Sequence, residues 1–421
     1  AILQAFVRRM EGKPEPESTA EKYKPRSFFE GVAMISDESL LRRLTLSLTG
    51  RLPTSAERKA VQGEGLPGLN GILEKLMTED AFYGRLKEGF NDIFLTDGYD
   101  GNGEVILSYN HFDKTRHWYQ KHDFSHIEEK RARQEALWDM ARVYRKAIRS
   151  EPLELIAHVV RNNRPFTEIM TADYMMVSPY SARGYGIFEQ VKDRFKDVDN
   201  PFEYVPAKLP ALKNRQGKVQ ESKTGNYPHA GLFSMFHYLR RYPTTETNRN
   251  RLRARMYYQH FLGINIMELA DQVADAAAID VKYETPWMEA ADCVVCHRTI
   301  DPVAGLFQDF YNEEGHYGPR KDGWFQDMFV PGLEGEDLPK VEKWRSLQWL
   351  AERTAKDPRF AVAMTEHVWY VLSGRMALRP PQDIEDPLFT PRRRAYTMQR
   401  REITEVAKQF SKANFNLKLI F

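Results

Sequence analysis

The two cysteines of this chain lie three positions apart, and a histidine follows the second one directly. Cys293, Cys296 and His297 form a Cys-x-x-Cys-His segment that uses every cysteine of the 421-residue sequence. This spacing is typical of covalent haem c attachment, in which each thiol adds across a vinyl group of the porphyrin. The adjacent imidazole then becomes an axial ligand of the iron. The sequence therefore predicts one covalent haem c, with His297 as its proximal ligand.

Two other kinds of site use a Cys-x-x-Cys pair, namely thioredoxin-like dithiols and structural zinc sites. A redox dithiol is expected after a strand in a βαβ unit, whereas residues 286–292 form a polar approach to a helix. A zinc site needs four ligands, usually with a second cysteine pair or a closely spaced histidine pair, and neither follows here. A chance match is the remaining alternative. Haem c attachment is favoured over all three.

Length and composition set limits on the scaffold that positions this segment. A chain of 421 residues exceeds the ~250–300 at which a single core stops growing, so two or three subdomains are expected. The net charge of +2 gives no reason to expect a nucleic-acid partner. No apolar run reaches the ~18 residues of a transmembrane helix, so no transmembrane segment is expected.

Covalent haem attachment takes place outside the bacterial cytoplasm, so a periplasmic or otherwise exported location is expected. The first seven residues are short for the apolar region of a signal peptide and precede Arg8 and Arg9, which is the wrong order of charge and apolar core. We therefore expect that an export signal has been removed.

Helical periodicity dominates from Ser39 onward, which predicts a mainly α fold with a multi-helix N-terminal scaffold. Because the haem motif begins the last helical region, we expect a C-terminal helical, cytochrome c-like haem domain there. The expected domains are an extended arm (1–35), an N-terminal helical domain (36–172), a central helical and irregular domain (173–280) and a haem c domain with C-terminal helices (281–421). A capping box is expected at Thr54–Glu57. Helices are expected at 40–48, 70–76, 81–95, 128–149, 152–162, 232–239, 247–262, 266–278, 338–355, 360–373 and 392–413.

Five segments, taken in order, resemble the planctomycete-type cytochrome c family, and they extend from about residue 40 to the end of the chain. These segments are 41–54; 166–174 with Tyr185-Gly186; 229–232 with 245–251; 293–297 with Ile300-Asp301-Pro302 and Gly305; and 357–360 through Trp369 to Gly374-Arg375. The resemblance implies c-type haem, export and helical architecture, but no assigned reaction. Family members often carry further haem or sugar-binding modules, whereas this chain has a single haem motif.

Haem chemistry suggests further side chains around the iron, and for Pro302 the resemblance adds support. The second ring nitrogen of His297 should donate to a backbone carbonyl or a carboxylate, and Pro302 of the family-like Ile-Asp-Pro turn is the candidate carbonyl. A plain helix stop is the alternative for Pro302. Haem propionates need cationic partners, and Arg298 is the candidate closest to the motif. Other arginines that could serve, each with a surface role as the alternative, are Arg249, Arg251, Arg253, Arg255, Arg320 and Arg375.

The sixth iron ligand decides the chemistry, because methionine gives an electron carrier, a second histidine lowers the potential, and an open site allows peroxide chemistry. Met328 is favoured because it lies in a loop bounded by glycine and proline. The other candidates are Met364, Met376, His229, His316 and His367.

The expected function is that of an exported monohaem c-type cytochrome in electron transfer. The part of the chain outside the haem domain is larger than a simple soluble carrier needs. Redox partner proteins, as other subunits of a larger assembly, are therefore expected. One alternative is an oxidase- or peroxidase-like enzyme with an open sixth site, which the lack of a second haem motif disfavours. The other alternative is a structural protein whose haem mainly stabilises the fold of the C-terminal domain. An electron carrier is favoured over a catalyst.

Overall fold

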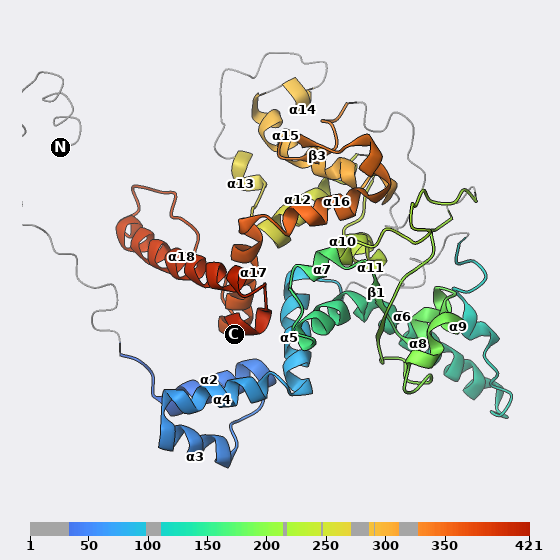
Figure 1. The fold of residues 1–421 in the computed structure, drawn as a ribbon, viewed down its shortest axis with the longest axis horizontal. Coiled ribbons are helices and arrows are strands. Elements are labelled where there is room, and N and C mark those ends of the chain that lie inside the picture. Colours follow the sequence, from blue (N-terminus) through green and yellow to red (C-terminus); the bar gives the residue numbers. More distant parts are fainter. Residues whose placement is uncertain are drawn as a thin grey trace, which may run out of the picture.

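The computed structural model describes residues 33–97, 111–213, 217–245, 247–270, 286–289, 291–310 and 327–421. Over these ranges the protein is mainly helical, which confirms the predicted fold class (Figure 1). The N-terminal helices are α2 (Asp37–Thr49), α3 (Ser55–Glu64), α4 (Leu66–Leu76) and α5 (Asp80–Phe94). Helices α2, α3 and α4 form a group at one end of the molecule, and α5 leads from that group toward its centre (Figure 1).

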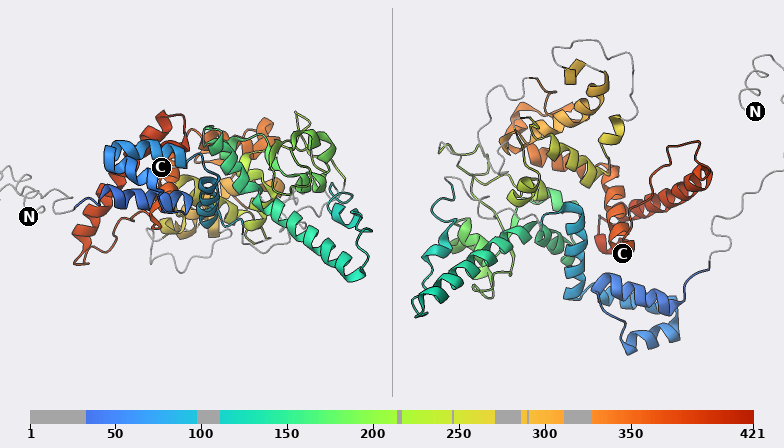
Figure 2. Two further views of the ribbon diagram at one scale, coloured as in Figure 1. Left: turned by 90° about the horizontal axis from the view of Figure 1, so that it is seen from below. Right: turned by 180° about the vertical axis from the view of Figure 1, so that it is seen from behind.

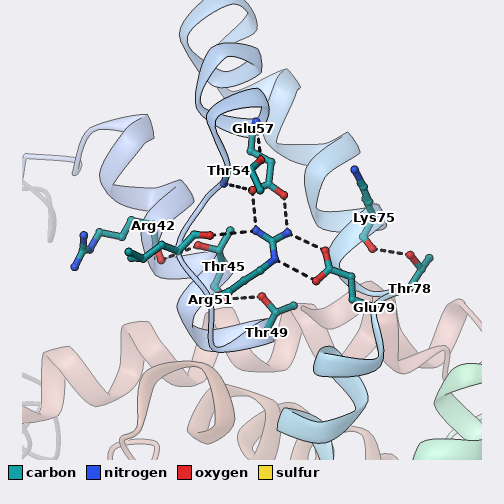
Figure 3. Close-up of polar contacts among 10 residues, drawn as sticks. Arg42, Thr45, Thr49, Arg51, Thr54, Glu57, Lys75, Thr78 and Glu79 are labelled. Carbon is teal, nitrogen blue, oxygen red and sulfur yellow. Dashed lines mark hydrogen bonds and ion pairs between the residues drawn. The ribbon is translucent and has the colours of Figure 1, made fainter.

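Polar side chains fix the turn between α2 and α3 (Figure 3). The Glu57 backbone N–H donates to Thr54 Oγ1 at 3.2 Å, and the Thr54 N–H donates to Glu57 Oε2 at 2.7 Å. The predicted capping box is therefore confirmed. Arg51 donates to both carboxylate oxygens of Glu57 and to both of Glu79, which ties the first turn of α3 to the residue that precedes α5.

Helix α6 (Lys130–Arg161) is continuous, although the sequence predicted two helices, 128–149 and 152–162. That prediction was wrong because Pro152 lies inside the helix instead of starting a new one. An interior proline costs about 3 kcal/mol through its missing N–H and its steric clash. Side chains on both sides of it, including Ile148 and Ile156, are buried in the same core, and this packing outweighs the cost.

Short elements make up the middle of the chain, and most of them lie in the region 173–280 that the sequence predicted to be helical and irregular. They are η2 (Trp118–Lys121), α7 (Glu168–Thr171), β1 (Met175–Val177), α8 (Pro179–Gly184), α9 (Phe188–Val191), η3 (Lys192–Arg194), β2 (Val205–Ala207), α10 (Gly231–Ser234) and α11 (Phe236–Arg241). Strands β1 and β2 pair antiparallel, with Met175 opposite Ala207 and Val177 opposite Val205. The predicted helix 232–239 is divided into α10 and α11 at Met235, which has an extended backbone.

The C-terminal half holds the longer helices again. Its elements are α12 (Arg251–Leu262), α13 (Met267–Ala270), α14 (Pro286–Glu289), α15 (Ala291–Leu306), η5 (Gln308–Phe310), β3 (Gly332–Leu333), β4 (Glu336–Asp337), η6 (Lys340–Arg345), α16 (Ser346–Thr354), α17 (Pro358–Ser373), α18 (Phe389–Lys412) and η7 (Leu417–Ile420). The predicted helix 338–355 begins later than expected, at Ser346. Leu338 donates its N–H to the Pro331 carbonyl beside β3, and this bond keeps its backbone out of the helix.

Helix α17 joins the two halves of the molecule, because it packs against α12, α18 and α5 (Figures 1 and 2). The Phe166 N–H also donates to the Phe415 carbonyl at 2.8 Å, which connects the segment before α7 to the C-terminal turn. One cluster of buried apolar side chains extends through these elements, from Leu41 to Leu417. The predicted domain boundaries at 172 and 280 stay predictions.

Candidate functional site

The Cys-x-x-Cys-His segment lies on helix α15. At 3.6 residues per turn, Cys293, Cys296 and His297 project from the helix within an arc of about 100°. Both thiols are free and partly exposed, and 22% of the His297 side chain is exposed. Burial, followed by the neighbouring Cys293, raises the pKa of the Cys296 thiol. One side of a single helix thus presents two thiols and an imidazole together.

A buried carboxylate one helical turn later holds the imidazole. Nδ1 of His297 lies 3.1 and 3.2 Å from the two carboxylate oxygens of Asp301, whose side chain is 0% exposed. Arg251, at the start of α12, donates to the same two oxygens through Nε at 2.7 Å and Nη2 at 3.1 Å. An ionised carboxylate only accepts hydrogen bonds, so Nδ1 is the donor. The lone pair of Nε2 then remains for a metal.

The ionisation of Asp301 follows from these contacts. Burial by itself raises the pKa of the carboxyl, but the hydrogen bonds from His297 and Arg251 outweigh it and hold the pKa of Asp301 below its usual value. Asp301 is therefore an anion at neutral pH, although it is shielded from water.

A second arginine reaches the same region from the turn before α12. Arg249 donates to both carboxylate oxygens of Asp327, with Nη2 at 2.9 Å from Oδ2. Arg249 and Asn250 have φ angles of 45° and 66°, a left-handed conformation that is costly for residues other than glycine. The Asn250 side chain donates to the Phe307 carbonyl at 3.0 Å and so fixes this turn against the end of α15. One ion pair, Arg251–Asp301, therefore joins the start of α12 to α15, and a second, Arg249–Asp327, joins the turn before α12 to the segment that begins at residue 327.

Pro302 lies inside α15, which continues to Leu306, so the alternative interpretation as a helix stop was wrong. The role of its carbonyl stays a prediction, and in this structure the His297 Nδ1 contacts Asp301 instead. The sequence interpretation missed Asp301 as the partner. The signal was present, because residues four apart on a helix lie on the same face.

Residues 327–333 run beside α15. The Arg298 side chain is exposed and lies 6.0 Å from the centre of the Phe329 ring. Pro331 packs so closely on Gly305 that a Cβ at Gly305 would lie 2.7 Å from Pro331 Cγ. Met328, in the same segment, is buried, with 5% exposure. The structure thus places the Met328 segment next to the haem motif, and the roles of Met328 and Arg298 as haem contacts stay predictions.

The other candidates for the sixth ligand have different surroundings. Met364 is fully buried in α17, whereas Met376 is 67% exposed. His229 Nε2 accepts the Leu209 N–H at 3.0 Å, and His367 Nε2 donates to the His260 carbonyl at 2.7 Å. Burial lowers the pKa of His229 to about 3 and that of His367 to about 4. Both histidines are thus hydrogen-bonded core residues. His316 lies outside the described residues.

The arginines considered for the propionates also have defined places. Arg249 and Arg251 form the ion pairs above, and Arg253 is buried and donates to the carbonyls of Tyr242 and Leu239. Arg375 is exposed, and Arg320 lies outside the described residues.

Metal-binding clusters and membrane-spanning helices are both absent from the described part of the chain. Within it, no group of three or more His, Cys, Asp or Glu side chains is arranged to hold a metal ion. Within the same ranges, no helix has both the length and the apolar character needed to cross a membrane.

A second buried carboxyl group lies between α6 and α8. Glu151 is 2% exposed, and the Tyr185 hydroxyl donates to its Oε2 at 2.6 Å. Burial raises the pKa of Glu151 to about 8, while hydrogen bonds from Tyr185 and Ser181 oppose this rise. A Cβ at Gly184 would lie 1.9 Å from the Tyr144 hydroxyl oxygen, so only glycine fits where α8 meets α6.

Comparison with known proteins gives one family match. Residues 110–187 match the model of the family PSD4, described as a protein of unknown function (DUF1592). This domain is known in planctomycete cytochrome c-like proteins. The match includes α6, α8 and the Glu151–Tyr185 pair, but not the Cys-x-x-Cys-His segment. No curated protein and no solved structure matches the chain.

Proposed function

We propose that this chain is a monohaem c-type cytochrome that transfers electrons outside the cytoplasm as a subunit of a larger assembly. The observation that carries the proposal is the arrangement on α15, where two free thiols precede an imidazole whose Nδ1 is bound to a buried carboxylate. The DUF1592 match supports the resemblance to planctomycete-type cytochromes c over residues 110–187. The expected export follows from the attachment chemistry.

The residues present fit haem c. Cys293 and Cys296 are free to form the two thioethers, and His297 can offer Nε2 to the iron because Asp301 takes the proton of Nδ1. Haem c, when bound, supplies a one-electron iron centre that one redox partner protein reduces and another reoxidises. The protein orients the imidazole through Asp301 and holds that carboxylate with Arg251.

A haem enzyme with an open sixth site is the second candidate. The charged partner of His297 favours it, because a carboxylate at Nδ1 increases the basicity of the ligating imidazole. A more strongly donating proximal ligand promotes O–O bond cleavage at haem iron. Among the six candidates for the sixth ligand, Met328 is the favoured residue, and its participation decides between carrier and enzyme.

The test is expression of the full chain with an export signal and a haem c maturation system. We expect haem to remain attached after denaturation and a mass increase of one haem, with neither in the Cys293→Ala/Cys296→Ala variant. Absence of covalent haem in the unmutated protein would overturn the proposal.

Absorption spectra of the same protein separate the candidates. A low-spin spectrum with the weak far-red band of oxidised, Met-ligated haem supports the electron carrier. This band should be lost in Met328→Ala and kept in the control variant Met376→Ala, which changes an exposed methionine. High-spin bands that shift on addition of cyanide or peroxide would support the enzyme instead. A third outcome would support a structural protein stabilised by its haem. In that case the covalent haem exchanges no electrons with redox proteins, and the chain does not fold when haem is withheld.

A further inference from the structure

We propose that Asp301, held in place by Arg251, is a positioning residue that fixes the hydrogen-bonding state of His297 and lowers the reduction potential of the haem. This inference rests on the proposed function, because it concerns the haem assigned to α15. It identifies a control on that haem which lies outside the Cys-x-x-Cys-His segment.

The geometry leaves the carboxylate little freedom. Each oxygen of Asp301 meets one atom of each neighbour: Oδ1 meets His297 Nδ1 and Arg251 Nε, and Oδ2 meets His297 Nδ1 and Arg251 Nη2. His297 and Asp301 lie on α15, whereas Arg251 comes from α12. Rotation of the imidazole would break its bond to a buried anion, which is costly. The contact between α12 and α15 therefore fixes the plane of the ring.

The charge of the acceptor determines the electronic effect. A carboxylate draws the Nδ1 proton more strongly than a neutral backbone carbonyl does, so it increases electron donation from Nε2. Stronger donation favours the more positive oxidation state of a bound iron and lowers its reduction potential. Arg251 opposes part of this effect, because its guanidinium neutralises the same carboxylate. Removal of Asp301 and removal of Arg251 should therefore shift the potential in opposite directions.

The molecule provides a matched control. The Arg249–Asp327 pair comes from the preceding turn and has the same two charge types, and its described hydrogen bonds join these two residues rather than His297. Asp327→Asn removes one negative charge from the same region. A general electrostatic effect would move the potential similarly in Asp327→Asn and Asp301→Asn, whereas an effect through the imidazole would appear in Asp301→Asn alone.

The experiment is a spectroscopic redox titration of the haem-loaded full chain and of the Asp301→Asn, Asp301→Glu, Arg251→Gln and Asp327→Asn variants. At the midpoint potential of the unmutated protein, we expect the ratio of reduced to oxidised haem in Asp301→Asn to rise about tenfold, which is about 59 mV for one electron. Asp301→Glu should restore part of this shift, Arg251→Gln should lower the ratio, and Asp327→Asn should change it by less than about threefold.

The outcomes separate the two proposals. Unmutated protein without covalent haem contradicts the proposed function itself. Covalent haem whose potential is unchanged in Asp301→Asn, or shifted equally in Asp327→Asn, overturns only the role of Asp301. If Asp301→Asn does not fold, Arg251→Gln carries the test, and a potential that rises or stays unchanged in that variant overturns the inference.

Discussion

Asp301 and Glu151 are both buried carboxyl groups, with 0% and 2% exposure, but their surroundings differ in one respect. Asp301, between α12 and α15, contacts the guanidinium of Arg251 and has a pKa below its usual value. Glu151, between α6 and α8, contacts the hydroxyl of Tyr185, and its pKa rises to about 8. Burial disfavours the charged form of both groups, so the presence of a cation decides which group ionises.

The difference separates the two regions chemically. At neutral pH, the carboxylate of Asp301 on α15 is negatively charged beside His297. The DUF1592-matched segment holds a largely protonated carboxyl instead. A fixed anion can influence a neighbouring metal centre, whereas a neutral acid contributes mainly hydrogen bonds and packing.

Removal of the cation beside Asp301 should have the largest effect. Arg251→Met should lower the free energy of unfolding by about 3–5 kcal/mol, because it leaves a buried carboxylate without its ion-pair partner. Denaturant unfolding at pH 7 measures the change. The matched control is Arg249→Met, whose partner Asp327 is 38% exposed, and it should cost less than half as much. Equal costs would show that burial of the carboxylate does not determine the effect.

The raised pKa of Glu151 should make the stability of the protein depend on pH. Below pH ~4.5 the carboxyl is protonated in the folded and unfolded states alike. As the pH rises toward about 8, the unfolded state ionises while the folded state retains the proton, so stability falls. Glu151→Gln should remove this loss, so its stability relative to the unmutated protein should rise by roughly 4 kcal/mol between pH 5 and pH 9.

Denaturant unfolding at both pH values measures this gain. Glu154→Gln, on the same helix and paired with Lys87, is the control and should show no such gain. If Glu151→Gln and the unmutated protein follow the same pH profile, Glu151 is not a protonated buried acid.

Tyr185→Phe removes the hydroxyl that donates a hydrogen bond to Glu151, at the position where Asp301 has an arginine. Loss of the 2.6 Å hydrogen bond should destabilise the protein by about 2 kcal/mol at pH 7, because a buried polar atom loses its donor. It should also enlarge the pH-dependent loss of stability and extend it to higher pH, because the folded-state pKa of Glu151 rises further without this bond. Tyr174→Phe, which removes a less buried bond to Glu168, should cost less. A larger effect of Tyr174→Phe would contradict this account.

The smallest effect is expected at an ion pair near the surface, where Arg51 meets Glu57 (Figure 3). The hydrogen bond from Arg51 lowers the pKa of Glu57 to about 2, so its stabilisation is present above pH ~4.5 and is lost as the pH falls through about 2. Arg51→Met should cost about 1 kcal/mol at pH 7, because Arg51 is partly exposed. It should also weaken the acid-induced loss, as measured by unfolding at pH 7 and pH 3. Arg58→Met, at an exposed position of α3, should change neither value.

Features that depend on residues close together in the chain could be predicted from the sequence. Helical periodicity predicted the mainly α fold, and the spacing of Thr54 and Glu57 predicted a capping box that the structure confirms. The Cys-x-x-Cys-His segment likewise follows from three residues within one and a half turns of α15. Local spacing suffices for such features, because a helix brings residues three and four positions apart onto one face.

Contacts between side chains on different helices could be identified only from the folded structure. The continuity of α6 through Pro152 depends on core packing that the local pattern does not show. The contact between His297 and Asp301 was readable from their spacing, but the ionisation of Asp301 depends on Arg251, which α12 brings from fifty positions earlier. Glu151 differs from Asp301 because its partners among the described residues are the hydroxyl groups of Tyr185 and Ser181 and include no cation. Burial and partners at long range set the charge of a carboxyl group, and both arise only when the chain folds.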